Sequence, residues 1–207
     1  MLFVWYKVSF DEKWSHDSAV CETVYFFVEF VCIFPWKCVS LNNQNRGKIM
    51  DGILRKLPIG IQTFEKLREG DYLYVDKTAL VWRIASTETP YFLSRPRRFG
   101  KSLLLSTFEA YFEGKKNLFE GLAIADMEKE WKTYPVFHLD LNAEKYDSPQ
   151  ALVEILSRQL TQWELKYGKG EDEETLSGRF AGVIRRACEQ SGRGVISIAR
   201  NSGALPF

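Results

Sequence analysis

From Met50 onward, the spacing of apolar residues predicts alternating strands and helices. Residues 72–75 form a short β-prone run, and Asp76 directly after them is well placed to cap a helix over residues 78–84. Residues 91–94 form an apolar run that is flanked by chain-breaking residues, which predicts a strand. The first part of this region is therefore predicted to be a β-prone run, a helix and a strand.

The remaining segments continue this alternation. They are a helix over residues 103–112 that Gly114 ends, a strand over 135–141, a helix opened by Ser148 and Pro149, a helix from about Glu173 to Gln190, and a strand over 194–198. The helix opened by Ser148 is predicted to present an apolar face of Leu152, Ile155, Leu156, Leu160 and Trp163. Strands separated by helices predict an α/β protein with a mainly parallel sheet.

Residues 1–49 differ in character from the rest of the chain. They are rich in Phe, Trp, Tyr, Val and Cys, without a helical period and with apolar residues at positions of both parities. Arg46-Gly47-Lys48 can be encoded by an unbroken purine run just upstream of the Met50 codon, as a ribosome-binding site would be. We therefore expect residues 1–49 to be leader sequence read from a wrongly assigned start, with a real N-terminal domain as the alternative.

Composition and charge narrow the class of protein without assigning a function. The hydrophobic share of 45% and the charged share of 27% are ordinary for a soluble globular protein, for which we expect a cytoplasmic location. A net charge of +1 creates no global field that would select nucleic acid or a membrane, so any basic site must be local. Residues 24–34 are apolar apart from Glu29, but they fall short of the roughly 20 residues that a membrane-spanning helix needs. The cysteines and histidines show no metal-ligand spacing.

Gly100-Lys101-Ser102 lies between a predicted strand and a predicted helix, which is the context that a phosphate-binding loop requires. Glycine lets the backbone approach a phosphate without a Cβ in the way, and the N–H groups that open the helix point at the anion. Lys101 would reach the outer phosphates, and Ser102 would offer its hydroxyl to Mg²⁺. The predicted nucleotide-binding residues are Arg97, Arg98, Phe99, Gly100, Lys101 and Ser102, and Ser102 is also the predicted metal ligand.

Two residues of this loop depart from the usual eight-residue pattern. Arg95 stands where the first glycine is expected, and Pro96 removes a backbone N–H. On the residues alone, a solvated basic turn therefore stays open beside a phosphate-binding loop.

Four segments carry a more specific pattern: Gly60–Leu67, Tyr72–Thr78, Tyr91–Ser102 and His138–Leu141. Together they resemble the predicted AAA-ATPase family of bacteria, over roughly residues 57–194. The run Ser-Arg-Pro-Arg-Arg-Phe-Gly-Lys-Ser is highly specific to that family, in which arginine replaces the first glycine. The resemblance implies a P-loop NTPase fold, ATP binding with Mg²⁺, and a downstream nuclease-like domain of the PD-(D/E)xK type.

The acidic residues that such ATPases use for hydrolysis are missing from this sequence. The resemblance implies an apolar strand ending Asp-Glu-Tyr-Asp directly after the helix that ends near Gln190. Here residues 195–198 form the strand, and no Asp or Glu occurs after Glu189. P-loop hydrolases use these acids to hold Mg²⁺ and to orient water, so we predict ATP binding without hydrolysis and assign no catalytic residue. Substitution by Asp140 or Glu144 is the alternative.

The same loss leaves the predicted fold incomplete. In the ATPase class that the family resembles, the strand before the P-loop lies between the fourth and fifth strands of the sheet, whereas this chain supplies the first three. We therefore predict an incomplete P-loop NTPase three-layer sandwich with a mainly parallel sheet, in which that strand lacks its neighbours. The predicted divisions are an atypical segment over residues 1–49, a truncated AAA-ATPase-like domain over 50–198 and an aberrant tail over 199–207.

Two other functions stay open. Arg95, Arg97, Arg98 and Lys101 would suit contacts with a nucleic-acid backbone, although Phe99 is the one aromatic residue interleaved with them. The chain would alternatively be a non-functional fragment of a frameshifted gene. No membrane partner is expected, and nothing in the sequence sets an oligomeric state.

Overall fold

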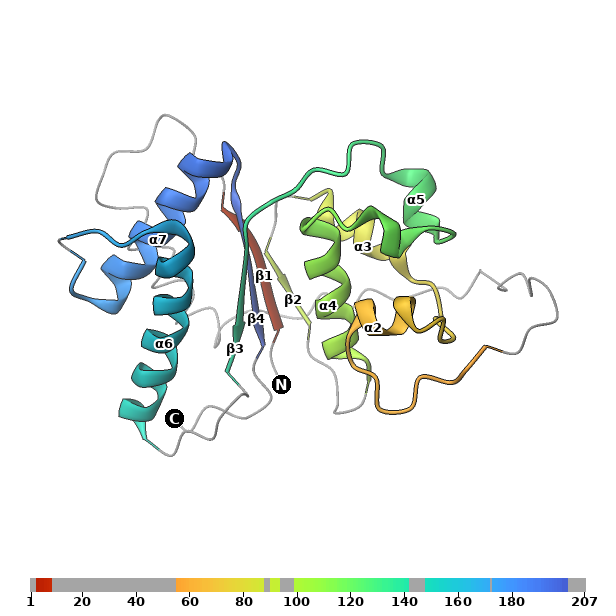
Figure 1. The fold of residues 1–207 in the computed structure, drawn as a ribbon, viewed down its shortest axis with the longest axis horizontal. Helices are drawn as coiled ribbons and strands as arrows, with labels where there is room; N and C mark the ends of the chain where they lie inside the picture. Colours follow the sequence, from red (N-terminus) through yellow and green to blue (C-terminus); the bar gives the residue numbers. More distant parts are fainter. Residues whose placement is uncertain are drawn as a thin grey trace.

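The computed structural model describes residues 3–8, 55–87, 90–93, 99–141, 148–171 and 173–200. In chain order they form β1 (Phe3–Val8), α2 (Phe64–Glu69), α3 (Thr78–Ala85), β2 (Tyr91–Phe92), α4 (Lys101–Phe112), the 3₁₀ helix η1 (Lys116–Phe119), α5 (Ala123–Met127), β3 (Val136–Asp140), α6 (Pro149–Tyr167), α7 (Leu176–Ser191) and β4 (Val195–Arg200). The strands form one sheet with helices on both sides of it (Figure 1). Within these ranges no helix is both long enough and apolar enough to cross a membrane.

The strand order in the sheet is β2-β1-β4-β3. β3 and β4 are parallel, whereas β1 is antiparallel to both of its neighbours, β2 and β4. It follows that β2, β3 and β4 all run in the same direction and that their carboxyl ends lie at one edge of the sheet. The mixture of helices and strands, together with the parallel β3–β4 pair, agrees with the predicted α/β class.

β1 corrects one expectation from the sequence. The sequence predicts that the strand before the P-loop lacks its neighbours, whereas β1 pairs with β2 at Val4 with Phe92 and at Trp5 with Tyr91. On its other side β1 pairs along the whole length of β4. The segment interpreted as leader sequence thus supplies a strand that pairs backbone N–H and C=O groups of both neighbours.

Side chains of β4 alternate between two hydrophobic cores on opposite faces of the sheet. On one face, Ile196 and Ile198 pack against α2, α3 and α4. These helices contribute Phe64, Val81, Leu105, Phe108 and Phe112 to this core. On the other face, Val195 packs with Phe137 of β3 and with α6 and α7. Helices therefore cover both faces, as is typical of parallel strands.

Two helix ends are placed as predicted because a residue with special backbone chemistry sets each of them. The Oγ of Ser148 accepts a hydrogen bond from the N–H of Ala151 at 3.2 Å, and Pro149 is the first residue of α6. Gly114, with φ of 72°, follows the end of α4 in the left-handed region. The five residues of the predicted apolar face of α6 are all buried or half-buried, which confirms that face.

The segment before α3 contains the β-prone run and the cap of that helix. Within the run, Tyr72 makes an isolated parallel β-bridge to Lys56. Asp76 caps α3 as predicted, since its Oδ1 accepts hydrogen bonds from the N–H and the hydroxyl of Thr78 at 2.8 and 2.7 Å. Its Oδ2 accepts a third from the N–H of Ala123 at 2.7 Å, which ties the start of α5 to the start of α3.

The start of α7 lies later than predicted. The helix begins at Leu176 rather than near Glu173, because the Oγ1 of Thr175 accepts a hydrogen bond from the N–H of Gly178 at 3.1 Å. Glu173 instead uses its carboxylate to bind Arg186 of α7. Glu173, which the sequence places in the helix, thus precedes α7 and binds one of its residues from outside.

Candidate functional site

Residues 99–102 of the predicted phosphate-binding loop lead into α4, which starts at the edge of the sheet where the parallel strands end (Figure 1). Gly100 caps α4 with φ of 71° and ψ of 18°, in the left-handed region. A Cβ at this position would meet no atom of the described residues within 4 Å, so the backbone conformation, not space, requires glycine. The carbonyl of Gly100 accepts a hydrogen bond from the N–H of Leu104 at 2.9 Å, which starts the helix.

Lys101 and Ser102 open α4, and neither residue is exposed. Lys101 is 8% exposed and Ser102 is half-buried, whereas Phe99 is 62% exposed. Lysine is almost never this buried unless its charge is paired. The first N–H groups of α4 have no acceptor within the helix, and the helix dipole makes this end partly positive. The start of α4 therefore carries partial positive charge.

The structure describes four of the six predicted site residues. Residues 99–102 are consecutive and lie at the start of α4. Arg97 and Arg98 lie outside the described residues, as do Arg95 and Pro96. Their contribution to phosphate binding stays a prediction.

Two further charged residues lie at the same edge of the sheet. β4 continues two residues beyond its predicted end at Ile198 and ends at Arg200. Asp140 ends β3 and is the register partner of Arg200. The Nη1 of Arg200 lies 3.4 Å from the Oδ2 of Asp140, within ion-pair distance. Asp140 is the alternative acid expected from the sequence, whereas Arg200 is not expected at this edge because the apolar run that predicts the strand stops at Ile198.

The pairing of the strands fixes how far Arg200 lies along the strand direction relative to Phe92, the last residue of β2. Val4 of β1 is level with Phe92 on one side and with Ala199 on the other. Arg200 is therefore one residue nearer the carboxyl edge than Phe92, at the level where the chain leaves β2. One strand lies between β2 and β4, so the two are about 10 Å apart.

The side chains described at this edge do not fit a Mg²⁺ ion held by protein carboxylates. Within the described ranges, no three carboxylate, histidine or cysteine side chains gather as they would around a metal. Asp140 is paired with Arg200, so a cation ends the strand that the family resemblance expects to end in acids. Ser102 offers a hydroxyl, which is one ligand of the six that Mg²⁺ requires. The donors at this edge suit a phosphate better than a metal.

Glu109 and His138 link α4 to β3 further from this edge. The Oε2 of Glu109 lies 3.2 Å from the Nδ1 of His138. The other ring nitrogen, Nε2, is buried and has no hydrogen-bond partner among the described residues. The pair holds the middle of α4 against the sheet, which supports a structural role for His138.

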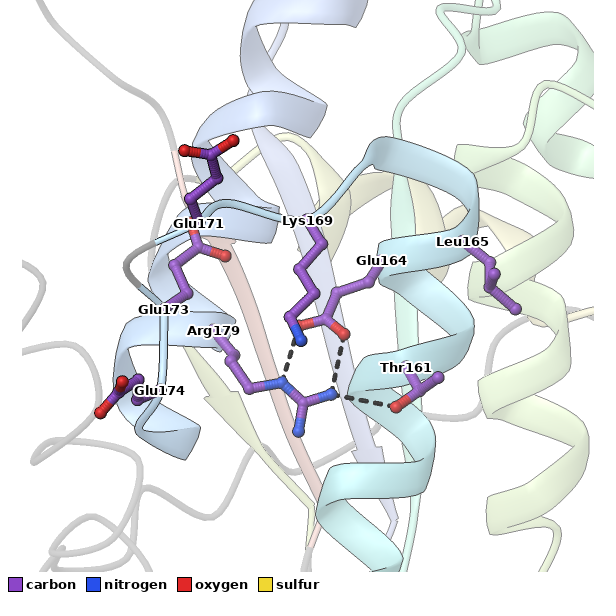
Figure 2. Close-up of a pocket in the computed structure, with 8 residues that line it drawn as sticks. All are labelled: Thr161, Glu164, Leu165, Lys169, Glu171, Glu173, Glu174 and Arg179. Carbon is purple, nitrogen blue, oxygen red and sulfur yellow. Dashed lines mark hydrogen bonds and ion pairs between the residues drawn. The ribbon is translucent and has the colours of Figure 1, made fainter.

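A pocket on the opposite face of the sheet lies between α6 and α7 (Figure 2). Its volume is about 530 Å³, and it is lined by Thr161, Glu164, Leu165, Lys169, Glu171, Glu173, Glu174 and Arg179. Four of these residues are glutamates and two are cations. The resulting negative charge disfavours a polyphosphate, so this pocket is not the nucleotide site.

Two of the four glutamates, Glu164 and Glu173, are paired with arginines of α7. Arg179 donates to both carboxylate oxygens of Glu164, at 2.7 and 2.8 Å, and to the Oγ of Ser157 at 2.7 Å. The hydrogen bond from Arg179 lowers the pKa of the Glu164 carboxyl although burial opposes the shift. Arg186 holds Glu173 in the same bidentate way, at 2.6 and 3.0 Å. We call these two ion pairs the α6–α7 network, and we interpret it as structural.

Comparisons with known proteins place the chain in a family. A family model described as a predicted AAA-ATPase (AAA-ATPase_like) matches residues 58–199. An "uncharacterized protein in vnfD 5'region" of Azotobacter chroococcum mcd 1 is 41% identical over 143 residues, which are 69% of this chain and 28% of that protein. The chain thus spans less than a third of the length of that relative. No solved structure matches. On the family model, which covers the loop and all of α4, the chain belongs to the family of predicted AAA-ATPases.

Proposed function

We propose that this protein binds ATP through the loop of residues 95–102 and does not hydrolyse it. The observation that carries the proposal is the placement of Lys101, which is buried at the first position of α4, directly after Gly100 in the left-handed conformation. The family implies nucleotide binding in general, and the family match includes this loop. We extend the proposal to the fold, as an incomplete P-loop NTPase sandwich.

Each part of the loop has a separate task in this proposal. The N–H groups at the start of α4 donate hydrogen bonds to the phosphates, and Lys101 neutralises their charge. Arg97 and Arg98 add charge from the preceding part of the loop. Phe99 offers an exposed ring to the nucleoside.

Hydrolysis requires more than phosphate capture. A metal ion and a water molecule must be positioned, and P-loop hydrolases use acidic residues for this task. At the carboxyl edge of the sheet, Asp140 is paired with Arg200. Mg²⁺ would enter with the nucleotide, with the hydroxyl of Ser102 as its proposed protein ligand, and we assign it no step of turnover.

The test is a calorimetric titration with ATP beside an assay of phosphate release. Lys101→Ala should weaken ATP binding about tenfold to a hundredfold, because a charge-assisted contact contributes roughly 1.5–3 kcal/mol. Lys116→Ala is the matched control, since this exposed lysine lies in η1, beyond the far end of α4. It should bind ATP like the wild type. Phosphate release should stay at background in all three proteins.

Two results would contradict the proposal. Equal affinity of wild type and Lys101→Ala would show that the loop is not the nucleotide site. Phosphate release that depends on Lys101 would show that another carboxylate acts in hydrolysis, with Asp140 the first to mutate. Single-stranded DNA that binds through Lys101 and that ATP does not displace would favour the nucleic-acid alternative.

A further inference from the structure

We infer that Arg200 neutralises the phosphates of the bound nucleotide in the role that a protein-held Mg²⁺ usually has, so that metal-free ATP binds at least as tightly as Mg²⁺-ATP. The inference rests on the proposed nucleotide site at the start of α4. It makes Arg200 a phosphate-binding residue, although it lies about 100 residues after the loop.

The position of Arg200 along β4 brings it to the edge of the sheet at which α4 starts. We call this edge the loop edge. Arg200 lies one residue closer to that edge than the level of Phe92, the last residue of β2. Figure 1 shows the start of α4 and the ends of β3 and β4 at the same edge of the sheet. The lateral separation of about 10 Å between β4 and β2 is short enough for the long arginine side chain to approach a ligand between them.

The side chain of Arg200 is on the face of the sheet that α4 covers. Ile196 and Ile198 of β4 belong to the core that α4 shares, and residues two apart on a strand point to the same face. The ion pair with Asp140 agrees with this assignment, because Asp140 is two residues after His138, whose ring contacts α4. Arg200 and Lys101 are therefore on the same side of the sheet.

The height of this ion pair relative to Lys101 follows from helix and strand geometry. Glu109 lies eight residues after Lys101, or about 12 Å along the helix axis. Asp140 lies two residues beyond His138, the partner of Glu109, or about 7 Å along the strand towards the loop edge. Because α4 runs back from that edge, Asp140 and its partner Arg200 lie about 5 Å from the level of Lys101, roughly one helical turn.

The chemistry of this position favours a phosphate over a cation. In the family that the chain resembles, the strand that corresponds to β4 ends in the acids that hold Mg²⁺, whereas here it ends in Arg200. A guanidinium group repels Mg²⁺ and binds phosphate oxygens in bidentate fashion. Exchanging the acids for arginine therefore removes the support for the metal and adds a positive charge in its place.

The ion pair with Asp140 is open enough to yield to a ligand. The side chains of Arg200 and Asp140 are 27% and 35% exposed, and their charged atoms are 3.4 Å apart. In the α6–α7 network, Arg179 and Glu164 are 13% and 6% exposed and 2.7 Å apart. A phosphate can therefore approach Arg200 from solvent, while Asp140 holds the guanidinium at the edge until it arrives.

The experiment compares ATP affinity in excess EDTA with affinity in excess Mg²⁺ by calorimetric titration of the full chain. The wild type should bind metal-free ATP at least as tightly as Mg²⁺-ATP. Arg200→Gln should lose about tenfold in affinity for metal-free ATP and less for Mg²⁺-ATP, because the metal then replaces the lost charge. Arg193→Gln is the matched control: it makes the same charge change before the opposite end of β4, where Arg193 bonds the carbonyl of Thr133. It should bind both forms like the wild type.

Asp140→Asn tests the same inference by a change that should raise the affinity for ATP rather than lower it. Removing the carboxylate should release Arg200 to the phosphates and raise the affinity for metal-free ATP severalfold. This variant keeps the inference falsifiable if Arg200→Gln does not fold, which circular dichroism will show. An unchanged or lower affinity in Asp140→Asn would count against the inference.

The outcomes separate this inference from the proposed function. If neither form of ATP binds, or if Lys101→Ala binds like the wild type, the proposed nucleotide site is wrong. If binding depends on Lys101 but requires Mg²⁺, or if Arg200→Gln matches Arg193→Gln, the site stands and the role of Arg200 is overturned.

Discussion

The α6–α7 network and the loop edge of the sheet both keep basic side chains close to the protein, but they satisfy these charges differently. In the network, Arg179 and Arg186 each bind both oxygens of one glutamate at 2.6–3.0 Å. At the loop edge, Arg200 meets Asp140 at 3.4 Å with both side chains partly exposed, and Lys101 lies beside the N–H groups that open α4. The ion pairs of the first region are short and largely buried, whereas the pair at the loop edge is longer and partly exposed.

This difference shows why the presence of a pocket is a poor guide to the functional site in this protein. The pocket of about 530 Å³ belongs to the network, and its acidic residues disfavour the ligand that the family implies (Figure 2). The loop edge is recognised instead by a left-handed glycine, a buried lysine and a strand that ends in arginine. Backbone conformation and the placement of basic residues are thus the better guide to the proposed site.

Breaking the network should cost the most stability. Arg179→Ala leaves Glu164 buried without its bidentate partner, and removing one member of a buried ion pair costs about 3–5 kcal/mol. The free energy of unfolding should fall by that amount in urea titrations. The ATP affinity of the folded protein should not change, because the network lies on the opposite face of the sheet from α4.

Arg179→Lys sharpens this prediction. Lysine keeps the charge but cannot bind both oxygens of Glu164 and the Oγ of Ser157 together, so it should be intermediate in stability. A loss below about 1 kcal/mol in Arg179→Ala would place the pair among weak surface ion pairs and would contradict the structural interpretation.

The parts of the fold that the sequence predicts correctly are those set by local chemistry. Ser148, Asp76 and Gly114 mark helix ends, because a cap or a left-handed residue acts over a few neighbours. The Gly100-Lys101 step is recognisable for the same reason, since loop and helix start are adjacent in sequence. Local signals therefore place the core of the candidate site.

The parts that the sequence does not predict depend on contacts between distant segments. β1 pairs with β2 and β4, but residues 1–49 have no regular alternation that would reveal a strand. The level of Arg200 relative to the loop is set by the pairing of β1 with β2 and with β4, which brings together segments about 100 residues apart. The bond from Arg179 to Glu164 joins two helices, and no spacing rule within one helix can indicate it.

A smaller disturbance of the network comes from a methyl group at Gly182. A Cβ there would lie 1.6 Å from the Oε1 of Glu173, so Gly182→Ala must displace that carboxylate from Arg186. We expect a loss of about 1–3 kcal/mol in the free energy of unfolding, measured in urea. Gly178→Ala is the matched control in the same helix, where the Cβ would lie 3.1 Å from the Oγ1 of Thr175. Its helix propensity gain offsets that tighter contact, so it should stay within about 1 kcal/mol of the wild type. If both variants lose the same free energy of unfolding, the loss at position 182 does not come from the contact with Glu173.

The smallest expected effect is the response of the network to pH. The hydrogen bond from Arg179 lowers the pKa of Glu164 below its ordinary value of 4.5, and that from Arg186 does the same for Glu173. A carboxyl whose pKa is lowered by folding stabilises the protein fully above its ordinary value, and this contribution is lost as the pH falls through the lower, folded value. Glu164→Gln cannot titrate at this position, so the difference in free energy of unfolding between wild type and variant isolates the effect from other acids. That difference should be constant between about pH 7 and pH 5.5 and should shrink below about pH 4.5. A difference that does not vary down to pH 3 would mean that the charge of Glu164 adds nothing to stability, and the contrast with the loop edge would then rest on geometry alone.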